Sequence, residues 1–270
     1  MHLAADTALR AIEIIAAIGV LISSLEFMTR PDLLASSSLL SWPVIRLARR
    51  STSHGRLGKA ADFFLTSPVL QWLFGARALA AAMLIVVPAC IRVPAPAHVL
   101  LLGVVVAGGA IRSLRAPFGG EGSDEVSQIV LTTLLLVSLR PTPMAMQIGL
   151  WLIALQACLA YFVSGIYKIT APMWLDGTAL TGVLRTRSYG NRTLAAWFAA
   201  RPTTARWVSR GLSLSETLFP LVLLAPSSFL PYFLAWGVAF HLTCAVVMGL
   251  DCFVWAFVAS YPAIAYAVLR

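Results

Sequence analysis

Residues 161–180 read YFVSGIYKITAPMWLDGTAL, an apolar segment that carries one lysine, Lys168, shortly before a proline. Tyr161, Ser164 and Lys168 follow one another at intervals of three and four residues, so a helix would place them on one face. The sequence has only one other lysine, Lys59. Because a charged side chain inside a membrane helix is costly, Lys168 is expected to pair, to reach the lipid headgroups or to have a function.

The composition is that of a membrane protein. Of the 270 residues, 59% are hydrophobic and only 11% are charged, whereas ordinary soluble domains carry about 25% charged residues. Several apolar runs are long enough to cross a bilayer as helices. We predict an all-α integral membrane protein with a single domain, 1–270, formed by a bundle of about eight transmembrane helices. The expected spans are 8–29, 69–92, 97–114, 126–143, 147–170, 206–226, 229–249 and 251–269.

The formal charge of +9 comes largely from arginines in the connections between apolar runs. This distribution follows the positive-inside rule and favours contact with a lipid bilayer rather than nucleic acid. We expect a basic loop at 30–68 and an interfacial or re-entrant connection at 171–205, after the fifth helix. The preference for arginine over lysine, with abundant alanine, indicates a bacterial protein of the inner (plasma) membrane that crosses the bilayer several times.

Arg77 lies well inside the second predicted helix. An arginine at the centre of a bilayer costs on the order of 3 kcal/mol, so Arg77 is expected to face the bundle interior and to meet a carboxylate. The candidates are Glu13, Glu26 and Glu216. In the glycine-rich connection before the fourth helix, Asp124 either caps that helix or forms part of the wall of a pocket.

Other polar residues also have structural interpretations. Lys168 can extend toward phosphates, or pair with Asp176 or Glu216. His241, inside the seventh predicted helix, can be an interior histidine bonded to a backbone carbonyl. Trp174 has the character of an interfacial anchor, and Asp176 that of a residue that starts a helix. The scattered histidines and cysteines lack the spacing of metal ligands, so no metal site is predicted.

Three segments resemble a known family. They are YFVSGIYKI with the following WLDGTAL (161–169 and 174–180), GGEGSDE (119–125), and FHLTCAVVMGLDCF (240–253) with Tyr261-Pro262. These segments resemble the horizontally transferred transmembrane (HTTM) domain, which vitamin K-dependent gamma-carboxylases share with many bacterial membrane proteins. The form of the first segment is most similar to the sporulation-delaying protein B family, whose members are needed to mature a secreted peptide toxin.

The resemblance implies two functions. The first is a maturation or accessory factor that modifies, processes or exports a small secreted peptide together with a partner protein. The alternative is a carboxylase-like membrane enzyme with a vitamin K or quinol cofactor. There, Lys168 is expected to act as a neutral catalytic base, which burial among apolar helices favours. His241 is expected to take part in catalysis by donating a hydrogen bond to a ligand or by positioning the lysine. Tyr161, Ser164, Trp174, Asp176, Asp124, Arg77 and Glu216 are expected to line the pocket. A small-molecule transporter or a lipid-binding protein is a third interpretation.

Overall fold

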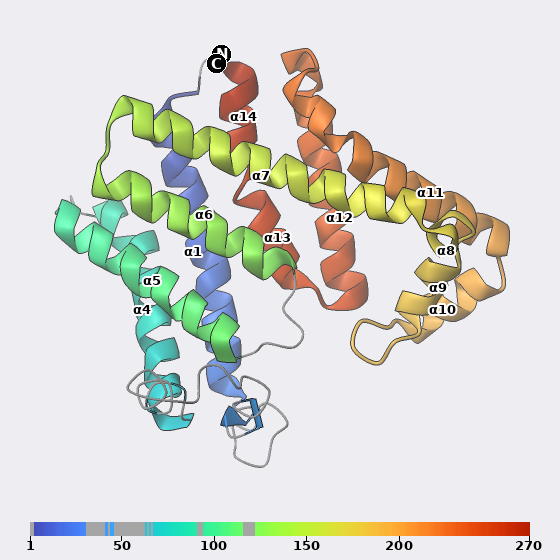
Figure 1. The fold of residues 1–270 in the computed structure, drawn as a ribbon, viewed down its shortest axis with the longest axis horizontal. Helices are drawn as coiled ribbons and strands as arrows, with labels where there is room; N and C mark the ends of the chain where they lie inside the picture. The colour runs from blue at the N-terminus through green and yellow to red at the C-terminus, as the bar shows by residue number, and fades with distance from the viewer. Residues whose placement is uncertain are drawn as a thin grey trace. The chain divides into compact units, whose positions relative to one another are not determined.

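The computed structural model describes residues 3–30, 41–42, 44–45, 63, 65, 67–90, 94–115 and 122–270, and the regular structure of these residues is helical (Figure 1). Most of the predicted basic loop 30–68, and residues 119–121 of the glycine-rich connection, lie outside the described residues. The contacts divide the chain into two compact units. We call residues 13–145 the N-terminal unit, and residues 1–12 with 146–270 the C-terminal unit.

The N-terminal unit contains most of α1 (Ala5–Thr29) and three further helices. These are α4 (Ser67–Cys90), α5 (Ala95–Arg115) and α6 (Gly122–Leu139). Helix α5 packs against both α4 and α6. In the described part of this unit, Leu70, Phe74, Leu102, Leu131 and Leu134 are among the most buried apolar side chains.

The C-terminal unit begins with the long helix α7 (Pro143–Thr170). Three short helices follow: α8 (Pro172–Leu175), α9 (Thr178–Leu184) and α10 (Arg192–Ala199). They gather at the end of α7, beside the start of α11 (Pro202–Leu218) (Figure 1). Two 3₁₀ turns, η3 (Phe219–Leu223) and η4 (Ser227–Phe229), lead into α12 (Leu230–Met248), α13 (Asp251–Val258) and α14 (Tyr261–Leu269).

Six helical segments of the described chain are long and apolar enough to cross a membrane, which indicates a multi-pass membrane protein. They are 5–29, 69–88, 95–115, 143–170, 227–248 and 251–269. The prediction of about eight spans is therefore not confirmed. The two expected spans that are missing from this set correspond to α6, whose first turns are polar, and to α11, which carries Arg206, Arg210 and Glu216.

Helix α11 has an unusual distribution of side chains. The residues that it buries include Ser209, Ser213 and Glu216, which follow one another at intervals of four and three and so share a face. Leu214 and Leu218, in contrast, are exposed. A soluble amphipathic helix has the opposite pattern. The buried polar face of α11 is the one that meets the candidate site.

Candidate functional site

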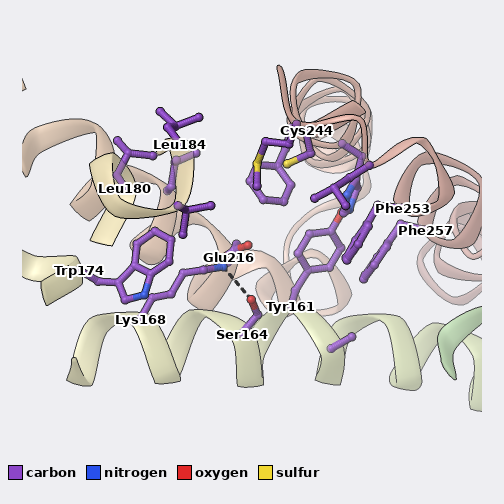
Figure 2. A pocket seen from close by; sticks show the side chains of 17 residues that line it. Tyr161, Ser164, Lys168, Trp174, Leu180, Leu184, Glu216, Cys244, Phe253 and Phe257 are labelled. Carbon is purple, nitrogen blue, oxygen red and sulfur yellow. Dashed lines mark hydrogen bonds and ion pairs between the residues drawn. The ribbon is translucent and has the colours of Figure 1, made fainter. Parts of the chain in front are cut away.

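Helix α7 presents three polar side chains to one cavity. Tyr161, Ser164 and Lys168 rise from the same side of the helix and point into the cavity (Figure 2), as expected from their spacing. Lys168 belongs to the last turn of α7. The helix ends directly after it because Ala171 precedes a proline and adopts an extended conformation (φ −95°, ψ 119°).

Lys168 forms an ion pair with Glu216 of α11. Its Nζ also donates a hydrogen bond to Ser164 Oγ at 2.7 Å and lies 5.4 Å from the ring centroid of Trp174. The predicted alternative in which Lys168 pairs with Glu216 is confirmed, whereas the partner suggested as an alternative, Asp176, bonds elsewhere. The amine is held between a carboxylate, a hydroxyl and an aromatic face, and only 19% of the lysine side chain is exposed.

A glycine on α7 allows this ion pair to form. A Cβ atom on Gly165 would lie 2.7 Å from Thr217 Cα and would also meet the Thr217 backbone nitrogen. The backbones of α7 and α11 therefore approach each other at Gly165 and Thr217. Gly165 comes one residue after Ser164, and Thr217 comes one residue after Glu216. A larger residue would separate the two helices and, with them, the lysine and the glutamate.

A second polar group forms the floor of the cavity. The hydroxyl of Tyr161 lies 2.7 Å from Nε2 of His241 (α12) and 2.7 Å from the hydroxyl of Tyr261 (α14). Gly237 leaves room for this contact, because a Cβ atom there would lie 3.0 Å from the Tyr161 hydroxyl. The interpretation of His241 as bonded to a backbone carbonyl is wrong: Nε2 meets Tyr161, and the buried Nδ1 has no hydrogen-bond partner among the residues that the structure describes.

Aromatic rings enclose Tyr161 and His241. Phe219 stacks on Tyr161 with ring centroids 3.9 Å apart, and Phe257 stacks on His241 at 4.3 Å. Phe253 lies parallel to Phe257 on the far side of the cavity from Trp174 (Figure 2). The lining around the polar groups is thus flat and aromatic, which suits a planar, apolar ligand.

The cavity has a volume of about 340 Å³ and is open on one side. Protein pockets that bind small molecules commonly have volumes of about 300–1,000 Å³, with apolar walls and a few convergent polar groups. A second cavity of about 430 Å³ adjoins it. The two share Leu180, Leu184, Leu212, Phe240, Cys244 and Met248, and the walls of the second are almost wholly apolar.

The electrostatics of the cavity depend on Glu216, which lies outside the six candidate spans. Burial raises the pKa of this carboxyl above its usual value, while the charge and hydrogen bond of Lys168 act in the opposite direction without cancelling the increase. A glutamate of this kind holds its proton more firmly than an exposed one. Glu216, held by Lys168, is therefore a candidate proton acceptor at the wall of the cavity.

Three residues that were expected in the pocket do not line this cavity. Asp176 is exposed and accepts hydrogen bonds from the backbone and the hydroxyl of Thr178 (both acting on Asp176 Oδ1), which hold its pKa below the usual value. Asp176 thus binds the backbone N–H of the first residue of α9, as predicted for a helix start, while Gly177 is the N-cap of that helix. Asp124 and Arg77 belong to the N-terminal unit, where Asp124 forms an ion pair with Arg112.

The predicted carboxylate partners of Arg77 are not the groups that it contacts. Its guanidinium donates to the hydroxyls of Ser23 and Ser24 at 3.4 and 3.2 Å and to the carbonyl of Val105 at 3.4 Å. Glu216 is committed to Lys168, and Glu13 lies 2.8 Å from Nε2 of His98. Short hydroxyl side chains on α1 and the α5 backbone thus take the place of the expected ion pair.

Sequence reasoning assigned no site role to Tyr261, Phe219, Phe257 or Cys244, which lie at the cavity or against its polar groups. Tyr261 belongs to one of the segments that carry the family resemblance, and this was the only indication in the sequence that Tyr261 lies at the site. In the described part of the chain, no group of three or more His, Cys, Asp or Glu side chains is placed to hold a metal ion. Comparisons with protein-family models, with curated proteins and with solved structures found no match.

Proposed function

We propose that this protein is a membrane enzyme that binds a lipophilic ligand with a weakly acidic hydroxyl group and removes the hydroxyl proton. The observation that carries the proposal is the Lys168–Glu216 ion pair at the wall of an apolar, aromatic cavity. A buried acid–base pair beside an apolar cavity is the arrangement that general acid–base chemistry requires.

The ligand class follows from the walls of the cavity. Phe253, Phe257 and Trp174 suit a flat ring, and the adjoining cavity suits an apolar chain attached to it. The ring of His241 lines the cavity, and its Nδ1 has no hydrogen-bond partner among the described residues. A quinol with an apolar chain, the cofactor class that the family resemblance implies, fits these features. When bound, a quinol would supply a reducing, ionisable ring.

The proton-transfer step involves the chain's own residues. The O–H bond of the ligand breaks, and its proton passes to the Lys168–Glu216 pair, which becomes an ammonium group beside a carboxylic acid. The raised pKa of Glu216 favours this uptake, since burial disfavours its charged form. Ser164 accepts a hydrogen bond from Lys168 Nζ and fixes the direction of the amine.

Oxygen uptake by a naphthoquinol tests this function. A quinol anion gives electrons to O₂ faster than the neutral quinol, and the products are the quinone and hydrogen peroxide. Purified protein in lipid nanodiscs is expected to accelerate oxygen uptake, and Lys168→Met is expected to return it to the rate without protein. Lys59→Met, which removes the other lysine of the sequence, is the matched control. Equal acceleration by Lys168→Met and by the control would exclude the Lys168–Glu216 pair as the proton acceptor.

The accessory role in the maturation of a secreted peptide stays a prediction from the resemblance. It differs from the enzyme in a measurable way, because the mass and yield of secreted peptides would change when the gene is deleted. Unchanged peptides would count against the accessory role and would leave the enzyme proposal standing.

A further inference from the structure

The last turn of α5, in the N-terminal unit, holds a buried arginine, two of whose guanidinium nitrogens have no hydrogen-bond partner in the described part of the chain. Arg115 is 3% exposed, and its Nε and Nη1 atoms form no hydrogen bond with any residue that the structure describes. Arg112, one turn earlier, also has an Nε atom without a partner. An unpaired buried charge costs several kcal/mol, so natural proteins provide it with a counter-charge or a ligand. Among the contacts that the structure describes, Arg115 has neither a counter-charge nor a ligand.

Arg77 brings a second buried guanidinium group to the same helix. Arg77 is 4% exposed and lies across α5 at Gly108, where a Cβ atom would lie 2.6 Å from its Cδ. Its hydrogen bonds go to neutral groups, the Val105 carbonyl and the hydroxyls of two serines of α1. Neutral acceptors solvate the cation but do not cancel its charge.

The helical repeat places these groups along one stripe of α5. Gly108, Arg112 and Arg115 follow at intervals of four and three residues, so they share a face. Arg112 pairs with Asp124 of α6, and both lie close enough to Arg77 for their charges to act on it. Arg112 and Arg77 thus lie near the one carboxylate of Asp124, Arg115 follows one turn later on the same face of α5, and a net positive charge remains.

We propose that Arg77, Arg112 and Arg115 form a binding site for a phosphate-bearing anion in the N-terminal unit. The planar guanidinium group matches phosphate oxygens in pairs, and a phosphate would supply the acceptors that Arg115 and Arg112 lack. Helix α5 is a candidate membrane span that ends at Arg115, and basic side chains at the end of a span meet the phosphates of lipid headgroups. The same chemistry would also recognise free phosphate. None of its three arginines lines the Lys168 cavity.

Thermal unfolding of the full chain with and without the anion tests the site. The protein is compared in nanodiscs of phosphatidylcholine, in nanodiscs that also contain phosphatidylglycerol, and in detergent with and without inorganic phosphate. The Arg115→Met variant removes the unpaired charge, and Arg140→Met removes an exposed arginine of the same unit as a matched control. Arg115→Lys keeps the charge and loses the planar fork.

We expect the difference in melting temperature between Arg115→Met and the parent protein to change sign when the anion is added. Without phosphate and in a neutral detergent, Arg115→Met should melt at a higher temperature than the parent protein, because the uncompensated charge is gone. Phosphatidylglycerol or phosphate should raise the midpoint of the parent protein and of Arg140→Met by several degrees. Arg115→Met should show less than half of that rise, and Arg115→Lys an intermediate rise.

The arms of the experiment separate the sources of the anion. A rise with phosphatidylglycerol alone identifies a lipid headgroup, and a rise with inorganic phosphate in detergent identifies a free anion. Either result supports the site if Arg115→Met suppresses it. Equal rises in all variants, or an Arg115→Met variant that is less stable than the parent by the same amount in every condition, would overturn the proposal.

Discussion

Gly165 of α7 faces the backbone of Thr217 of α11, and this contact places Glu216 opposite Lys168. A Cβ atom on Gly165 would lie 2.7 Å from Thr217 Cα, closer than non-bonded carbons approach. The ion pair at the cavity therefore depends on the absence of a side chain at a position that carries no polar chemistry. The missing side chain at Gly165 thus permits both the close approach of α7 and α11 and the ion pair between Lys168 and Glu216.

Gly165→Ala is expected to lower the free energy of unfolding by about 1–3 kcal/mol, because the added methyl group must push α11 away. In a helix without such a contact, the same exchange stabilises by about 1 kcal/mol. Gly211→Ala on α11 is the matched control, since nothing lies within 4 Å of a Cβ atom there. Chemical denaturation in detergent measures both variants. A Gly165→Ala variant as stable as Gly211→Ala would contradict the close approach.

Removal of one partner of the ion pair is expected to cost more than removal of both. Lys168→Met or Glu216→Leu alone should each lower the free energy of unfolding by about 3 kcal/mol, because a buried charge is left alone. The double variant should lie within about 1 kcal/mol of the parent protein. A double-mutant cycle gives the coupling energy. Additive losses would show that the two groups do not interact.

The cost of Lys168→Met should depend on pH. Burial raises the pKa of Glu216 in the folded state, so the folded protein binds more protons than the unfolded chain between the two pKa values. Stability from this group is full below the unfolded pKa and is lost as the pH rises through the folded pKa. Without Lys168 the folded pKa rises further, since the opposing attraction is gone. The unfolding midpoint of Lys168→Met should therefore fall more between pH 5 and pH 8 than that of the Lys168→Met, Glu216→Gln double variant. Parallel pH profiles of the two variants would contradict this assignment.

Tyr161→Phe tests the second polar group. The change leaves His241 Nε2 and the Tyr261 hydroxyl without their shared partner, and buried polar groups without partners cost about 1–3 kcal/mol each. We expect a loss of about 2 kcal/mol in the free energy of unfolding. Tyr167→Phe, on an exposed residue of the same helix, should change it by less than about 0.5 kcal/mol. Similar losses of unfolding free energy for both tyrosine variants would show that the hydrogen bonds of the Tyr161 hydroxyl do not stabilise the fold.

Much of the fold follows from local sequence patterns. Long apolar runs predicted the helical membrane character, and the spacing of Tyr161, Ser164 and Lys168 predicted their common face on α7. The number of spans was not predictable from apolar runs alone. Helix α11 mixes arginine, serine and leucine, and it turns Ser209, Ser213 and Glu216 toward the protein while Leu214 and Leu218 are exposed.

The site was predictable only in part, because its contacts join distant segments. Glu216 was one of two named partners for Lys168, and only the approach of α11 at Gly165 selects it. Tyr261 lies 100 residues after Tyr161 in the sequence, and no local pattern links a tyrosine at the start of α14 to a helix face on α7. For Arg77 the expected carboxylate was replaced by hydroxyls and a backbone carbonyl, which sequence spacing does not reveal.

The ionisation state of a bound probe tests the central claim most directly. An alkylated naphthol absorbs at a longer wavelength when its hydroxyl group is ionised, so an absorption spectrum shows whether the protein has removed the proton. We expect the probe to ionise at a lower pH when bound to the protein than in detergent alone. We expect Lys168→Met to abolish this shift and Lys59→Met to preserve it. A probe that binds equally well to all three proteins, with its hydroxyl group un-ionised in each, would contradict the account.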